Sequence, residues 1–116
     1  MKNVSLCSVK ECNETGKKVF QIEGLEILLI HAGNDYFAVD NICPHAKTRL
    51  ISGRVEDGTL TCSNHGACFD LKTGAIRLDR VDEDLLEQID VDNLPFGPLK
   101  IYPLQIEDEM IIIQIP

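Results

Sequence analysis

Two cysteine–histidine pairs are the residues of this 116-residue chain whose types and spacing can support metal chemistry. Cys43 and His45 enclose one proline in the segment NICPHAKTRL, and Cys62 and His65 enclose two residues in TCSNHGACFD. Residues 46–61 separate the two pairs. Thiolate sulfur and imidazole nitrogen are good ligands for zinc and for iron. The four side chains therefore predict one shared metal site.

The ligand types alone leave two kinds of site open. Two thiolates and two imidazoles suit a structural zinc ion, which prefers four such ligands in a tetrahedron. Common zinc motifs, however, pair cysteine with cysteine and histidine with histidine, whereas here each pair contains one of each. Pairs that each contain one cysteine and one histidine favour a centre whose two metal ends have different ligands.

The composition excludes several other functions. Nineteen acidic residues against eleven basic ones give a net charge of −8, which repels nucleic acid and favours a partner with a basic face. No apolar stretch is long enough for a signal peptide or a membrane span, and no Gly-x-x-x-x-Gly-Lys phosphate loop is present. We therefore expect a cytoplasmic protein without membrane or nucleic-acid partners, whose reduced thiols are available to metal.

Short strands separated by turns are expected to position the ligands. Asp57-Gly58 is a strong hairpin signal, and Ile111 to Ile113 are apolar enough to be buried on both faces of a sheet. Each ligand pair follows a strand-like segment and so occupies a loop that a rigid sheet can hold. The fold class is all-β, with strands expected at residues 17–23, 26–32, 36–40, 51–56 and 59–62, around the turn at 73–74, and on both sides of the turn at 107–109.

An acidic stretch breaks this pattern. Residues 82–92, DEDLLEQIDVD, contain six acids and no base, and Val81, Leu85 and Ile89 share one helical face. The spacing predicts a short helix. Its charge is explained equally well by a solvated surface and by a docking surface.

The ligand pattern resembles the signature of the Rieske iron–sulfur family, in which two cysteines bind one iron and two histidines the other. The segments DNICPH, GRVEDGTLTC, HGACFDLKTGA and PFGPLKIY, and the ending EDEMIII, also resemble Rieske ferredoxins, so the likeness covers nearly the whole chain. It implies a single domain, residues 1–116, built as an antiparallel β-sandwich or barrel. It further implies a small cluster-binding subdomain, formed by the two ligand loops and a proline loop at Pro95 to Leu99, with an acidic insertion at about 78–94.

The resemblance implies a site and a function. Cys43 and Cys62 would bind one iron of a single 2Fe–2S cluster, and His45 and His65 the other, with no catalytic residue. The protein would be an electron carrier and not an enzyme, passing electrons from a flavin-dependent reductase to a terminal oxygenase or another acceptor. The alternatives are a small electron-entry or regulatory subunit of a larger reductase, like the nitrite reductase small subunit, and a zinc-stabilised interaction module.

Departures from the high-potential members of the family indicate a low-potential cluster. Those relatives carry an extra cysteine in each ligand loop and hydroxyl donors after the second histidine. The matching positions here are Thr48, Asn64, Ala67 and Phe69, which offer neither a disulfide nor either donor. Hydrogen bonds to cluster sulfur stabilise the reduced state, so their absence lowers the reduction potential.

The remaining cysteines and the third histidine have simpler interpretations. Cys68 is expected to be a small buried thiol, and Cys7 and Cys12 plain strand or turn residues. His31 has no neighbouring cysteine and is expected to face solvent from a strand. Asp70 and Thr73 are expected to organise the turn in DLKTG.

Overall fold

The computed structural model describes residues 2–43, 49–62, 67–77 and 98–116. Within these residues the chain is almost entirely antiparallel β-structure, which confirms the predicted fold class. The elements are β1 (Lys2–Ser8), α1 (Val9–Thr15), β2 (Lys17–Ile22), β3 (Leu25–Ala32), β4 (Asp35–Asp40), the 3-10 turn η1 (Leu50–Ser52), β5 (Arg54–Glu56), β6 (Thr59–Thr61), β7 (Cys68–Asp70), β8 (Ile101–Tyr102), β9 (Leu104–Glu107) and β10 (Met110–Ile115).

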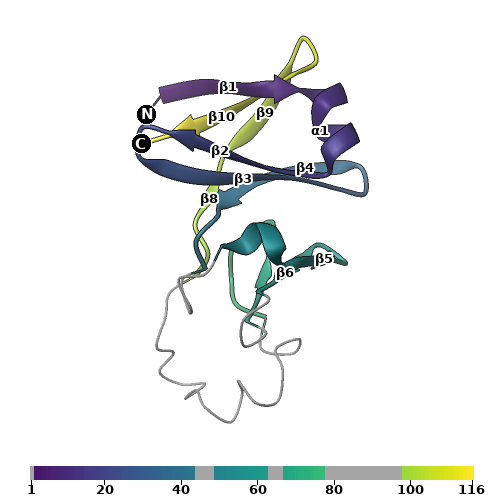
Figure 1. Ribbon diagram of the computed structural model, residues 1–116, viewed down its shortest axis with the longest axis vertical. Helices are drawn as coiled ribbons and strands as arrows, with labels where there is room; N and C mark the ends of the chain where they lie inside the picture. Colours follow the sequence, from purple (N-terminus) through teal and green to yellow (C-terminus); the bar gives the residue numbers. More distant parts are fainter. Residues whose placement is uncertain (1, 44–48, 63–66, 78–97) are drawn as a thin grey trace.

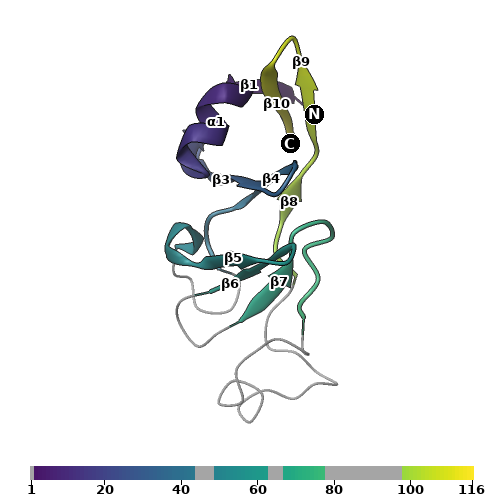
Figure 2. The same cartoon turned by 90° about the vertical axis from the view of Figure 1, so that its right-hand side faces the viewer.

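The strands form three sheets that lie in layers. The outer sheet has the order β1-β10-β9, the middle sheet β2-β3-β4-β8, and the small sheet β5-β6-β7. The middle sheet lies between the other two, with α1 at one end of the outer and middle sheets (Figures 1 and 2). Strands β1 and β10 pair from Lys2 opposite Ile115 to Ser8 opposite Met110, so the two chain ends lie side by side (Figure 1).

Strand β3 is the centre of the core because both of its faces are covered. Leu28 and Ile30 pack in a cluster with residues of the small sheet, whereas Ile27 and Leu29 pack in clusters that contain residues of β10. All four side chains are fully buried. This explains why the run ILLI, residues 27–30, is continuously apolar instead of alternating, as expected for a strand buried on both sides.

The tight turns use the backbone conformations that their residues favour. Asp57 and Gly58 both have positive φ, 51° and 73°, between the paired strands β5 and β6. Such turns match the twist of an antiparallel hairpin. The predicted hairpin is thus confirmed. The turn after β7 is also as predicted, because the Lys72 and Thr73 N–H groups donate to Asp70 Oδ1 at 2.8 and 3.1 Å.

Helix α1 was not predicted. Ser8 caps it by accepting a hydrogen bond from the Glu11 N–H at 3.1 Å, and Gly16 ends it with a φ of 76°. Ser8 and Glu11 have the spacing of a capping box, and glycine commonly follows a helix end, so the signal was present in the sequence. Cys12, expected in a strand or turn, lies in this helix.

Strand β10 is buried on one face only. Ile111 and Ile113 are fully buried, whereas Ile112 between them is half-buried. The expectation that all three would be covered on both faces is therefore wrong. The outer sheet has the middle sheet on one side only (Figure 2), and side chains alternate between the two faces of a strand.

Some sequence predictions fall on residues that the structure does not describe. The predicted helix at 82–92, the acidic insertion at 78–94 and residues 95–97 of the proline loop lie outside the described residues. Among the residues that are described, no helix is long and apolar enough to span a membrane.

Candidate metal centre

Cys43 and Cys62, the two predicted thiol ligands within the described residues, are both buried. Their relative exposures are 0% and 2%, and both belong to one buried apolar cluster that also contains Ala67, Phe69 and Leu99. This cluster lies between the middle sheet and the small sheet. His45 and His65 lie outside the described residues. The structure thus places the two predicted thiol ligands in one buried cluster, and the ligand set as a whole stays a prediction.

The first ligand loop is closed at its root by backbone pairing. Ile42 forms an antiparallel bridge with Arg49, and the Leu50 N–H donates to the Asn41 carbonyl oxygen at 2.6 Å. Cys43 therefore begins a loop whose two ends are held together. The predicted placement of this ligand in a loop that follows a strand is confirmed.

The second ligand loop is the tip of the β6–β7 hairpin. Thr61 pairs with Cys68 across the hairpin, and the Cys62 N–H donates to the Ala67 carbonyl oxygen at 2.7 Å. The loop that contains His65 in sequence is thus bounded by residues in fixed register. A hairpin in a packed sheet provides a rigid support for a metal ligand.

Leu99, at the described end of the predicted proline loop, packs in the cluster that contains Cys43 and Cys62. The Leu99 N–H donates to the Gly74 carbonyl oxygen at 2.8 Å, and the Asp40 N–H donates to the Lys100 carbonyl oxygen at 2.9 Å. Gly74 has a φ of 79°, and a Cβ added there would lie 2.1 Å from the Leu99 carbonyl oxygen. Glycine is therefore required for this close approach.

The other three cysteines, which the sequence does not predict as ligands, are also buried. Cys68 is fully buried, as predicted, and its sulfur accepts a hydrogen bond from Thr61 Oγ1 at 3.4 Å. Cys7 and Cys12 pack in a different buried cluster, between α1 and the outer and middle sheets. Burial, with smaller contributions from Cys7 and Glu11, raises the pKa of the Cys12 thiol to about 11. Burial likewise raises the pKa of Cys7. Both thiols are protonated at neutral pH.

His31 is a strand residue without a metal partner among the described residues. Its ring stacks on Tyr36 with centroids 4.8 Å apart, and it is half-buried. His31 lies in a strand as expected, but it is half-buried instead of solvent-facing, because the aromatic neighbour across the β3–β4 pair covers one side.

Two ionisable groups lie where β4 leads to the first ligand loop. Burial raises the pKa of Asp40, although hydrogen bonds from the Ile42 and Asn41 N–H groups and the charge of Lys100 oppose this shift. Burial and the nearby Asp40 carboxylate raise the pKa of Tyr102. The Tyr102 hydroxyl has no hydrogen-bond partner in the described part of the chain.

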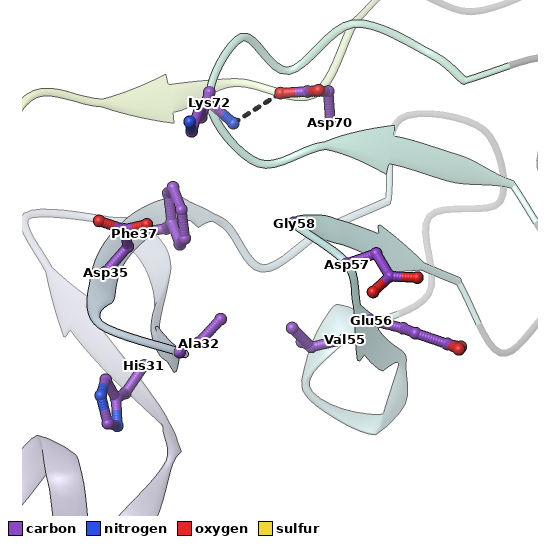
Figure 3. Close-up of a pocket in the computed structure, with 11 residues that line it drawn as sticks. His31, Ala32, Asp35, Phe37, Val55, Glu56, Asp57, Gly58, Asp70 and Lys72 are labelled. Atoms are coloured by element: carbon purple, nitrogen blue, oxygen red, sulfur yellow. Dashed lines mark hydrogen bonds between the residues drawn. The ribbon is translucent and has the colours of Figure 1, made fainter.

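A separate cavity of about 670 Å³ lies between the β3–β4 turn and the β5–β6 turn. Figure 3 shows Asp35 on one side and Asp57 on the other, with Asp70 and Lys72 above them. Neither Cys43 nor Cys62 is among its described lining residues. Asp70 accepts the turn hydrogen bonds given above and pairs with Arg77 at 3.6 Å, so its carboxylate has a structural role.

Sequence reasoning missed the side chains that hold the first ligand loop in place. Asn41 is 1% exposed and bonds to Glu26 on β3, and Lys17 on β2 binds the carbonyl oxygens of Ile51 and Gly53. These contacts join residues that are far apart in the chain. No sequence motif signals them.

A comparison with family models decides between the zinc and iron interpretations. The model of the Rieske [2Fe-2S] domain matches residues 2–95. The chain belongs to this family. The cofactor of this Rieske protein is accordingly a single 2Fe–2S cluster, and the structural zinc alternative is set aside.

Individual relatives and solved structures agree with this assignment. The chain is 31% identical over 99% of its length to the 3-phenylpropionate/cinnamic acid dioxygenase ferredoxin subunit of Photorhabdus laumondii, of which it covers 96%. It is 28% identical over 77% of its length to the anthranilate 1,2-dioxygenase ferredoxin subunit of Burkholderia cepacia, of which it covers 69%. The ferredoxin of carbazole 1,9a-dioxygenase from Nocardioides aromaticivorans shares the fold with a TM-score of 0.74 at 21% identity, and each chain is covered to 97%.

The described residues fit an iron–sulfur cluster. Cys43 and Cys62 would supply two soft sulfur donors, which suit iron in such clusters. Both lie in an apolar, water-poor cluster whose other members offer mainly hydrocarbon side chains. Within the described part of the chain, such surroundings offer few side-chain donors to the sulfurs of a cluster.

Proposed function

We propose that this Rieske protein is a one-electron carrier that receives electrons from a flavin-dependent reductase and delivers them to a terminal ring-hydroxylating oxygenase in the cytoplasm. The observation that carries the proposal is the burial of Cys43 and Cys62 in one apolar cluster, in a chain of this family. The two relatives described above are named ferredoxin subunits of dioxygenases. Their names favour an oxygenase system over a nitrite reductase subunit.

The proposed ligand set follows the sequence pattern. Cys43 and Cys62 bind one iron, and His45 and His65 bind the other. The cluster supplies a centre that gains or loses one electron. The roles of the protein are to hold the four ligands in one geometry, to keep water from the thiolate end and to present a surface for docking. No residue acts on a substrate, and the protein is an electron-transfer component of an oxidoreductase system.

A reductive titration tests the carrier function directly. The purified protein, titrated with dithionite in the absence of oxygen, is expected to take up one electron per chain, with bleaching of its visible absorption and the appearance of an EPR signal. Mixing the reduced protein with a terminal oxygenase of the dioxygenase class should then restore the oxidised spectrum. A protein that takes up no electron, or that holds its electron in the presence of every such oxygenase, would contradict the proposal.

The reduction potential is expected to lie near the low end of the Rieske range, about −150 mV. Ala67 and Phe69 are fully buried in the cluster of Cys43 and Cys62 and carry no hydroxyl group. The double substitution Ala67→Ser and Phe69→Tyr should raise the potential by on the order of 100 mV, because hydroxyl donors to the cluster stabilise its reduced form.

Protein-film voltammetry measures the reduction potentials of the wild-type protein and of the double variant. The control is Ala75→Ser with Phe20→Tyr, which adds the same two hydroxyls at an exposed turn and in the cluster beneath α1. This control should leave the potential unchanged. A wild-type potential well above zero, or an equal rise in the control, would argue against a cluster without side-chain donors.

The acidic segment at 82–92 is expected to steer the protein toward a basic partner. Electrostatic steering raises the association rate more than the affinity and weakens as the Debye length falls to about 8 Å at physiological ionic strength. Neutralising Asp82, Glu83, Asp84 and Glu87 together should slow electron transfer from the reductase at low salt about tenfold, without changing the potential.

A second variant separates local steering from net charge. It removes the same number of carboxylates far from this segment in sequence, at Glu23, Glu107, Asp108 and Glu109. Stopped-flow rates at low and high salt compare the two variants. Equal slowing would show that only net charge matters, and an unchanged rate in the first variant would show that the acidic segment is a solvated surface.

A further inference from the structure

One carboxylate oxygen at the root of the first ligand loop accepts two side-chain hydrogen bonds. Glu26 Oε1, on β3, accepts from Asn41 Nδ2 at 3.0 Å and from Arg49 Nε at 2.9 Å. Asn41 lies two residues before Cys43, and Arg49 closes the same loop through its bridge with Ile42. A single side chain of the central strand therefore holds both ends of the loop.

Asn41 has a hydrogen bond at every polar position. Its N–H donates to the Glu26 carbonyl oxygen at 2.9 Å, and its carbonyl oxygen accepts from Leu50. Its side-chain oxygen accepts from the Ile51 N–H at 3.0 Å, and its amide group donates to the Glu26 carboxylate. The residue is 1% exposed, so a lost bond would leave a buried polar group unpaired, which is unfavourable. Arg49 is largely exposed, and its ion pair is screened by solvent.

The exit of the loop is also fastened from the other side. Lys17 Nζ, on β2, donates to the carbonyl oxygens of Ile51 and Gly53 at 2.8 and 2.7 Å. A Cβ added at Gly53 would lie 2.5 Å from the carbonyl oxygen of Thr61, the residue before Cys62. The exit of the first loop therefore packs against the strand that carries the second thiol ligand. A displacement of Asn41 would reach both ligand loops.

We propose that Asn41 and Glu26 are positioning residues for the iron–sulfur centre. Their hydrogen bonds fix the entry and exit of the Cys43 loop to β3, so that the loop has one geometry and retains the cluster. The inference rests on the proposed function, because it requires a cluster in the site. Neither residue binds the cluster, and both act through the backbone of the ligand loop. Groups that orient metal ligands in this way commonly alter metal retention about 10- to 100-fold when they are changed.

Exchanging the donor and the acceptor of the hydrogen bond between Asn41 and Glu26 provides the test. Asn41→Asp keeps an oxygen for the Ile51 N–H but cannot donate to Glu26, and it places two carboxylates against each other. Glu26→Gln is the milder variant, because it keeps an acceptor oxygen and removes only the charge. In the double variant, the amide introduced at position 26 can donate to the carboxylate introduced at position 41 and restore the bond in the opposite direction.

Two readouts are made on the cluster-loaded proteins. The first is the rate of visible bleaching by a chelator at 25 °C, expected to rise about tenfold in Asn41→Asp, less in Glu26→Gln, and to return towards the wild-type rate in the double variant. The second is the EPR line shape of the reduced cluster. It should broaden in Asn41→Asp and narrow again in the double variant, because the loop regains one geometry. A general loss of stability would reduce the amount of cluster but not broaden the signal.

Glu23→Gln is the matched control. Glu23 lies in the turn before β3 and forms an exposed ion pair with Lys2, so its substitution removes a carboxylate close to Glu26 without touching the loop. It should bleach at the wild-type rate. If Asn41→Asp accumulates too little protein, Glu26→Gln and the double variant decide the outcome. Single variants that bleach like wild type, or a double variant whose bleaching equals the product of the single effects, would overturn the inference. A wild-type protein without a cluster would instead overturn the proposed function.

Discussion

His65→Ala protein is expected to be purified without the iron–sulfur chromophore, and His45→Ala protein likewise. Each substitution removes one of two proposed imidazole ligands from the same iron, and alanine offers no replacement donor. Iron content and labile sulfide should fall below about a tenth of the wild-type value, because changing even a group that only orients a metal ligand commonly lowers metal affinity about 10- to 100-fold. Thermal unfolding should also begin at a lower temperature, because metal binding stabilises the loops that provide its ligands.

His31→Ala is the control for both histidine variants. His31 is half-buried on β3 and stacks on Tyr36, and it is not part of the buried cluster that contains Cys43 and Cys62. This variant should retain the full absorption spectrum and the full iron content. If His65→Ala or His45→Ala retains a stoichiometric cluster with an unaltered EPR signal, the assignment of that histidine as a ligand is wrong.

Gly74→Ala is expected to lower the free energy of unfolding by about 3 kcal/mol. Gly74 has a left-handed φ of 79°, and the new Cβ would lie 2.1 Å from the Leu99 carbonyl oxygen. The obstruction is backbone, which cannot rotate away as a side chain can. The hydrogen bond from the Leu99 N–H to the Gly74 carbonyl oxygen would be strained by the same shift. Because Leu99 ends the proline loop and packs with Cys43 and Cys62, the cluster should also bleach faster.

Gly33→Ala separates the steric effect from the conformational one. Gly33 also has a left-handed φ, 63°, but no atom lies within 4 Å of an added Cβ. Its substitution should cost only about 1 kcal/mol, the usual penalty for a left-handed alanine. Urea unfolding followed by circular dichroism measures both variants. Equal decreases in the free energy of unfolding for Gly74→Ala and Gly33→Ala would show that Leu99 does not constrain Gly74.

Local patterns predicted most of the strands from residue 17 onward, but they missed β1 and the 3-10 turn η1 inside the strand expected at residues 51–56. The turn at Asp57 and Gly58 was predictable because its dipeptide favours positive φ, and strand β3 because its apolar run is long. The positions of Cys43 and Cys62 followed from their place after strand-like segments. Each of these signals lies within a few consecutive residues.

Other features depend on distant contacts that local patterns do not contain. The pairing of β1 with β10 joins the two ends of the chain, and the hydrogen bonds of Asn41 reach back to Glu26 on another strand. The burial of Ile112 depends on whether another element covers the face of the outer sheet that points away from the middle sheet. Helix α1 is the exception, since Ser8 and Glu11 gave a local signal for a helix that spans only two turns.

Metal and sulfide analysis of the purified protein tests the central claim most directly. The account predicts two irons and two labile sulfides per chain, with a red-brown absorption spectrum and, after reduction by one electron, the EPR signal of a cluster with mixed thiolate and imidazole ligands. One zinc ion per chain without labile sulfide would contradict it, because the same cysteines and histidines would then form a structural site that exchanges no electron.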